Sequence, residues 1–156
     1  MRQIRTSVFE TNSSMTHSIV MCPTQGYNDW IKGKAMFNEY KKPQFLPVEE
    51  ARQYNADILK KWYEATVVKQ DEEDDNYMYF ETETLEVFTE ENIEKYANGD
   101  FDFSEFYFDN YEVTEQLYYT YDYWNENVCE YYEIFSDEYE TPGGESVTAF
   151  GYYGHD

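Results

Sequence analysis

Residues 47–65, PVEEARQYNADILKKWYEA, are the stretch whose structure the sequence predicts most clearly. Pro47 suits the first turn of a helix, and the two glutamates that follow suit the positive end of the helix dipole. Two lysines near the other end suit its negative end. The apolar residues keep a helical spacing, at Val48, Ala51, Ile58, Leu59 and Trp62. The stretch therefore predicts an amphipathic helix from Pro47 to about Ala65.

Short strands are predicted before this helix. Residues 3–9 and 17–22 are rich in β-branched and apolar residues, which is typical of strands, and Pro23 ends the second one. Polar cap and turn formers separate the two strands. A short helix is expected around residues 29–31.

After the helix, the sequence predicts an alternation of strands and one further helix. Residues 77–82 and 84–88 have strand composition. Thr89 then caps a helix through Tyr96, which Asn98-Gly99 stops. Strand character returns at Phe101, Phe103 and residues 106–108.

The C-terminal part contains one ambiguous segment, residues 117–135. Its large apolar and aromatic residues lie alternately four and three positions apart, which favours a helix, whereas its many tyrosines favour a strand. The residues with this spacing are Leu117, Tyr121, Trp124, Val128, Tyr131 and Phe135. We expect a helix from about Asp122 to Phe135 with a strand before it. Residues 141–144 predict a turn, and residues 146–153 predict a final strand. The whole pattern predicts an α+β fold with an antiparallel sheet, two or three helices and an aromatic-rich core.

The composition predicts a folded, soluble chain. Its 156 residues, which include 18 Tyr, 11 Phe and 3 Trp, fit a single domain spanning residues 1–156 and provide large rings to bury. No stretch is long and apolar enough to cross a membrane, and no signal peptide is apparent. Cys22 and Cys129 have no metal-type spacing, and we expect free thiols in a reducing compartment, the cytoplasm.

The charge is strongly segregated along the chain. The net charge is −22, yet ten of the eleven Lys and Arg residues lie in residues 1–70, which are slightly basic. Residues 71–156 carry the whole excess of negative charge, and Lys95 is their one cation. This asymmetry predicts an interaction surface that engages a basic partner and excludes direct binding of nucleic acid.

Carboxylates in the acidic part are the predicted contact residues. Read as strand, residues 100–109 would place same-face carboxylates about 6.6 Å apart, on the scale of a phosphate backbone. Interleaved tyrosines would supply rigid contact area. The predicted partner-binding residues are Asp71, Glu72, Glu73, Asp74, Asp75, Asp100, Asp102, Glu105, Asp109, Glu112 and Glu115, with Tyr107 and Tyr111.

Two further uses of the chain stay open at this point. An enzyme or small-ligand binder would use Asn12, Ser13, Ser14 and His17, where hydroxyls and an imidazole lie close together in sequence. An adaptor protein of phage type would bind a basic partner without blocking nucleic acid. Neither a cofactor nor a metal is predicted, because no ligand cluster and no phosphate-binding glycine loop is present. The oligomeric state is left open.

Two segments resemble known proteins. Residues 8–18, VFETNSSMTHS, resemble a segment near the start of many small uncharacterised phage and prophage proteins, and residues 141–154 are similar to the C-terminus of some of them. This resemblance implies a phage origin and no particular activity. In overall character the chain is similar to acidic anti-restriction and anti-CRISPR inhibitors, without a shared motif. The leading prediction is an inhibitor, not an enzyme, that mimics nucleic acid.

Overall fold

The computed structural model describes residues 15–70, 73, 78–108 and 110–155, with the backbone alone at 15–17, 110–112 and 155. These residues form two compact units: one contains the residues up to Ala35 and those from Thr120 onward, and the other contains Met36–Tyr119. The boundaries of the units do not coincide with the charge boundary at residue 70. That the whole chain acts as one domain stays a prediction.

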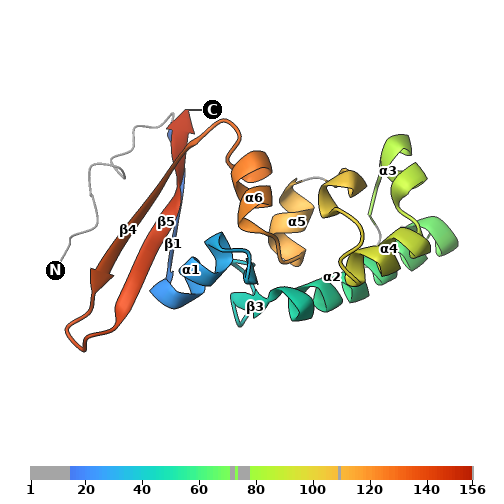
Figure 1. The fold of residues 1–156 in the computed structure, drawn as a ribbon. Helices are drawn as coiled ribbons and strands as arrows, with labels where there is room; N and C mark the ends of the chain where they lie inside the picture. The colour runs from blue at the N-terminus through green and yellow to red at the C-terminus, as the bar shows by residue number, and fades with distance from the viewer. Residues whose placement is uncertain (1–14, 71–72, 74–77, 109, 156) are drawn as a thin grey trace. The chain divides into compact units, whose positions relative to one another are not determined.

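A three-stranded antiparallel sheet is the centre of the first unit (Figure 1). Its strands are β1 (Met15–Pro23), β4 (Glu133–Glu140) and β5 (Ser146–His155), in the order β1-β5-β4. β1 pairs with β5, so that Cys22 lies opposite Thr148. The predicted strands at 17–22 and 146–153 are therefore confirmed, and they are neighbours in one sheet. The predicted strand at 3–9 lies outside the described residues.

One face of β1 and β5 packs on the helices of this unit. Val20, Cys22 and Phe150 are buried, while Ile19 and Met21, which alternate with them on β1, are exposed. The helices are α1 (Thr24–Ile31), α6 (Tyr121–Tyr123) and the π-helix η4 (Trp124–Val128). Trp30 of α1 is 1% exposed, and its ring lies 5.1, 5.3 and 5.2 Å from those of Tyr121, Trp124 and Phe150 between centroids.

The helix predicted at 122–135 is right only in its first part. Helix covers residues 121–128, and β4 begins at Glu133. Tyr131, a member of the apparent helical stripe, is 82% exposed, so the 4-3-4-3-4 spacing continues past the end of the buried face. The predicted turn at 141–144 is confirmed: Gly144 has φ +84° and its N–H donates to the Thr141 carbonyl at 2.9 Å.

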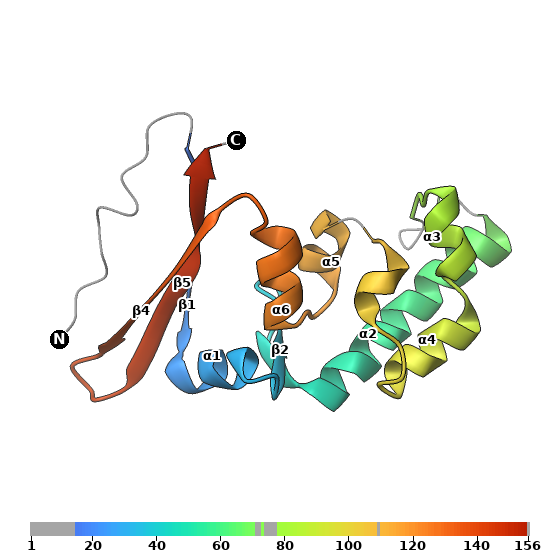
Figure 2. The same ribbon diagram turned by 45° about the horizontal axis from the view of Figure 1, so that its top comes forward.

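The second unit is mainly helical (Figure 2). β2 (Ala35–Phe37) and β3 (Phe45–Pro47) form a two-stranded sheet, and Phe37 also bridges to Tyr119. The helix predicted from Pro47 to Ala65 is confirmed as α2 (Val48–Tyr63), continued by the π-helix η2 (Glu64–Lys69). The remaining elements are α3 (Thr82–Val87), α4 (Glu90–Ala97), the 3-10 helix η3 (Phe103–Phe106) and α5 (Asn110–Gln116).

Three strand predictions in this unit are wrong. Residues 78–81 have no regular secondary structure, and residues 82–87 form α3. Met78 and Phe80 are buried and Tyr79 is exposed, as in a strand, but no described strand pairs with them. Residues 101–108 contain η3 and turns, because their phenylalanines enter one ring cluster instead of alternating across a sheet.

That ring cluster is the core of the second unit and confirms the aromatic-rich core. Phe88 is fully buried and contacts four rings, with centroid distances between 5.2 and 6.0 Å: Tyr63, Phe80, Phe106 and Phe108. Such edge-to-face and tilted pairs contribute about 0.5–1.5 kcal/mol each beyond their burial. The α+β class and the antiparallel sheet are also confirmed, with more helices than the two or three expected.

Both cysteines are buried in the first unit, and we expect their thiols not to react in the native protein. Burial raises the pKa of Cys22 to about 11 and that of Cys129 to about 12. At pH 8 the native thiols should therefore react with iodoacetamide roughly 100-fold more slowly than in urea, because the thiolate is the nucleophile. Mass spectrometry after timed labelling measures this, and rapid native labelling at either position would contradict the described packing.

Candidate functional site

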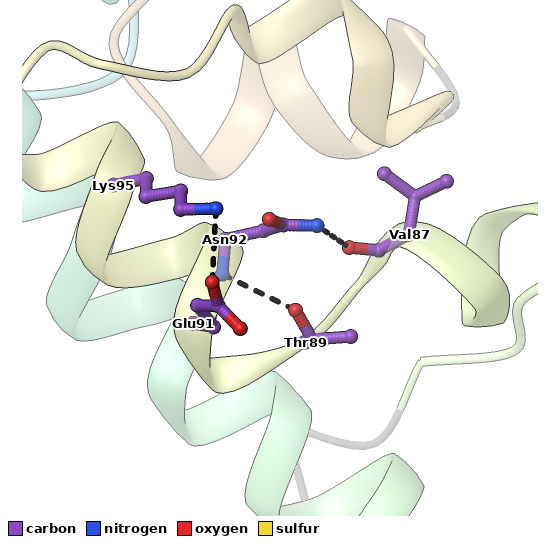
Figure 3. A network of polar contacts seen from close by, with 5 residues as sticks. All are labelled: Val87, Thr89, Glu91, Asn92 and Lys95. Atoms are coloured by element: carbon purple, nitrogen blue, oxygen red, sulfur yellow. Dashed lines mark hydrogen bonds and ion pairs between the residues drawn. The ribbon is translucent and has the colours of Figure 1, made fainter.

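Helix α4 begins at a cap that the sequence predicts. The Thr89 hydroxyl accepts the Asn92 N–H at 3.2 Å, and the Asn92 side chain donates to the Val87 carbonyl at 2.7 Å (Figure 3). Asn98 is the C-cap, and Gly99 has φ +83°, which confirms the predicted stop. The helix is thus fixed at both ends, and its orientation follows from burying Ile93 and Tyr96.

Burial of that face leaves the acidic face of α4 exposed. Glu90 and Glu94 are four residues apart and share one side of the helix, with Glu91 and Lys95 beside them. On α3, Glu83 and Glu86 are three residues apart and also exposed. On both α3 and α4, helical periodicity therefore places the carboxylates on the exposed face when the apolar residues are on the buried face.

We name the region from Glu81 to Glu105 the acidic segment 81–105. All of its carboxylates are exposed to solvent, and it carries one cation, Lys95. It comprises α3, α4, the first three residues of η3 and the turns between them. The exposed carboxylates are those of Glu81, Glu83, Glu86, Glu90, Glu91, Glu94, Asp100, Asp102 and Glu105.

Few cations offset this charge. Lys95 binds Glu91 at 2.9 Å, and this hydrogen bond lowers the pKa of the Glu91 carboxyl (Figure 3). The Arg52 guanidinium of α2 lies against Gly99, where an added Cβ would stand 2.7 Å from Nη1. In the described part of the chain, the carboxylates of Glu83, Glu86 and six other members of the segment have no ion-pair partner. Most of the segment's negative charge is therefore available to a partner.

Tyr107 places an aromatic ring directly after this segment. Its side chain is 66% exposed, whereas its neighbours Phe106 and Phe108 are buried and stack on each other at 5.3 Å. Its φ of +56° is in the left-handed region, which is uncommon for a bulky residue. The backbone is held there because the Tyr107 N–H donates to the Ser104 carbonyl at 3.3 Å and the Thr84 hydroxyl donates to the Tyr107 carbonyl at 3.4 Å. The fold thus keeps this ring in solvent.

The structure corrects how the predicted contact residues at 100–115 are arranged. They do not lie along a strand, so the spacing of about 6.6 Å does not apply. Asp102 caps η3, where its Oδ1 accepts from the Ser104 N–H at 2.9 Å and from the Ser104 hydroxyl at 2.8 Å. This local competition for backbone donors favours a turn over a strand. Glu105 is exposed on η3, and Asp100 is exposed in the turn before it.

The remaining predicted residues divide into four groups. Glu115 lies on α5, is half-buried and, after Glu39 and burial, helps to raise the pKa of Tyr40. Tyr111 and Glu112 are placed on α5 by their backbone. Glu73 is exposed in a turn and has contacts of its own. Asp71, Glu72, Asp74, Asp75 and Asp109 lie outside the described residues.

The alternative ligand site cannot be assembled from the part of the chain that the structure describes. Asn12, Ser13 and Ser14 lie outside it, and His17 is a backbone position on β1 opposite Tyr153. In the same register His155 lies opposite Met15, two positions from His17. A ligand site at this segment stays a prediction.

Sequence reasoning missed the carboxylates of α3 and α4. Its contact residues pass from Asp75 directly to Asp100, although six acids from Glu81 to Glu94 lie between them. That run was the available signal.

No family model, curated protein or solved structure matches the chain. Within the described ranges, no three His, Cys, Asp or Glu side chains come together to hold a metal ion. No helix in those ranges has the length and apolar character needed to span a membrane.

Proposed function

We propose that the protein is an inhibitor of phage type that mimics nucleic acid and occupies the basic nucleic-acid-binding site of a host protein. The target class is a defence nuclease, a restriction or CRISPR effector, or a component of transcription, and the site of action is the bacterial cytoplasm. The observation that carries this proposal is the acidic segment 81–105, with nine exposed carboxylates and one cation. The resemblance of residues 8–18 to phage proteins supports the biological setting.

Energetics support a binding role for this segment. Like charges three or four residues apart destabilise a helix by about 0.2–0.5 kcal/mol per pair, and both α3 and α4 contain such pairs. Among the described residues, the one ion pair of the segment is that of Lys95 with Glu91. A surface lined with Lys and Arg would offset the repulsion, as it does for the phosphates of DNA.

The exposed ring of Tyr107 adds the second component of a recognition surface. Tyrosine contributes large contact area for few rotatable bonds, and it also accepts a cation on its face. Arg side chains, which are common in nucleic-acid-binding grooves, can bind a carboxylate in bidentate fashion and stack on a ring. Asp102, Glu105 and Tyr107 offer both groups within one short turn.

Affinity capture from a bacterial lysate tests this function. The immobilised protein should retain a DNA- or RNA-binding protein at about 50 mM salt and lose it steeply by about 300 mM, since screening shortens the reach of exposed charges. Added nucleic acid should displace the retained protein. A polyglutamate column is the control for unspecific cation exchange. Retention that is unchanged by salt, or a partner that keeps its nucleic acid while bound, would refute mimicry.

A further inference from the structure

Strand β4 forms one edge of the sheet in the first unit. The order β1-β5-β4 leaves β4 with one neighbour, and among the described residues no strand lies on its other side (Figure 1). Its eight residues span about 27 Å at the usual rise of a strand. An unpaired edge of this length presents backbone N–H and C=O groups that can pair with an added strand.

β4 also extends beyond the helices that cover its neighbours. Ser136 lies opposite Phe150, so the two side chains share a face of the sheet, yet Phe150 is 1% exposed and Ser136 is exposed. Ile134, Glu138 and Glu140 belong to the same face of β4 and are exposed as well. Among the residues that the structure describes, no strand covers this edge of β4, and the side chains on this face are exposed.

The acidic side chains of β4 favour a positively charged partner. Glu138 and Glu140 stand two residues apart on the open face, about 7 Å from each other along the strand. Glu138 accepts the Ser146 hydroxyl at 3.1 Å, and Glu133, on the other face, accepts the Tyr153 hydroxyl at 2.6 Å. After Lys95 the chain contains no Lys or Arg, so no cation of the C-terminal part competes for these carboxylates.

The two faces of β4 differ in burial. Phe135 and Tyr139 are half-buried on the face opposite to Glu138 and Glu140, and Asp137 between them is 6% exposed and has its own contacts. A strand added at this edge would therefore meet carboxylates and apolar groups on both faces, with Ile134 beside Glu138 and Glu140 on one face and Glu133 beside Tyr139 on the other. Cross-strand pairs of opposite charge, or of an aromatic with a β-branched residue, stabilise such an addition.

We propose that the edge of β4 binds an extended segment of a partner protein, in which Lys or Arg alternates with apolar residues, by strand addition. The proposal rests on the proposed function only in that the partner is basic, and it involves a different unit of the chain. Acidic side chains also discourage pairing between two copies of β4. Repulsion of another copy and attraction of a basic segment are two results of the same charge.

The test uses the full chain and an eight-residue acetylated peptide of alternating Lys and Val with a fluorescent label. A second peptide carries N-methyl groups on alternate backbone nitrogens, which keeps its charge but prevents strand pairing. Fluorescence anisotropy should show at least about tenfold weaker binding of the methylated peptide, because its backbone hydrogen bonds are lost. NMR chemical-shift changes of the unmodified complex should be centred on the backbone amides of β4.

Matched variants separate the edge from diffuse attraction. Glu138→Gln with Glu140→Gln should weaken peptide binding about three- to tenfold, whereas Glu126→Gln with Glu130→Gln, the same change in charge outside β4, should leave it within about twofold. Equal binding of the two peptides, or equal effects of the two variant pairs, would overturn the proposal. Peptide binding at β4 without capture of a nucleic-acid-binding protein would reject the proposed function alone, and the reverse result would reject this inference alone.

Discussion

Replacing Asn55 by Ala should lower the free energy of unfolding by about 3–5 kcal/mol, the largest effect that we expect from one side chain. Asn55 lies on α2 and is fully buried. Its Nδ2 donates to the Tyr118 carbonyl at 2.7 Å and to the Tyr96 hydroxyl at 2.8 Å, and its Oδ1 accepts the Tyr118 N–H at 2.8 Å. The variant would leave backbone groups of Tyr118 buried without partners.

Chemical denaturation followed by tyrosine and tryptophan fluorescence measures this loss. Gln53→Ala is the control on the exposed side of the same helix, where the side chain bonds to Asp57 at 3.3 Å, and it should change stability by less than about 0.5 kcal/mol. Tyr96→Phe removes one acceptor of the network and should cost about 1–2 kcal/mol. If Asn55→Ala costs no more than Gln53→Ala, the network does not hold α2 to the segment around Tyr118.

The sequence predicts local structure well where one residue type has one strong physical preference. Pro23 ends β1, Thr89 caps α4 and Gly99 follows its C-cap, as each does in the sequence-based prediction. The turn that includes Gly144 belongs to the same group. These are short-range effects of a missing N–H, a hydroxyl acceptor or a permitted positive φ, and they need no knowledge of tertiary contacts.

Prediction fails where tertiary packing decides between helix and strand. Phe106 and Phe108 have strand propensity, but both bury their rings in the cluster around Phe88, and the chain bends to place them there. Thr84 and Phe88 are buried four residues apart, which is the helical signal that β-propensity concealed. Asn55 shows the same limit, since its partner at position 118 is remote in sequence.

For the candidate site, the sequence predicts the sign of the charge but not its geometry. The number of acidic residues after residue 70 can be counted in the sequence. The exposure of those on α4 depends on which face of this helix packs inward, and the inward face is the one with Ile93 and Tyr96. Tyr107 was predicted as a contact residue from composition. Its left-handed backbone and its place between two buried rings could not be predicted, because both result from the ring cluster.

Reversing three charges of the acidic segment should nearly abolish partner binding. Glu86, Glu94 and Glu105 are exposed, lack ion-pair partners among the described residues, and lie on α3, α4 and η3. Glu86→Lys, Glu94→Lys and Glu105→Lys together should weaken binding of the captured protein at least about 100-fold, because like charges face each other across the interface. Surface plasmon resonance at about 50 and 300 mM salt should also show a shallower salt dependence.

The matched control decides whether a surface or the net charge is recognised. Glu126→Lys, Glu130→Lys and Glu145→Lys make the same change in net charge at exposed positions of the other unit, outside β4. This triple variant should weaken binding by less than about fivefold, since exposed charges outside an interface act mainly on association through screened, long-range attraction. Both triple variants should keep the circular dichroism and thermal unfolding of the parent. In the first triple variant, Lys near the C-terminal ends of α3 and α4 suits the helix dipole. Equal losses in the two triples would mean that the partner responds to total charge, and the acidic segment 81–105 would then not be its binding surface.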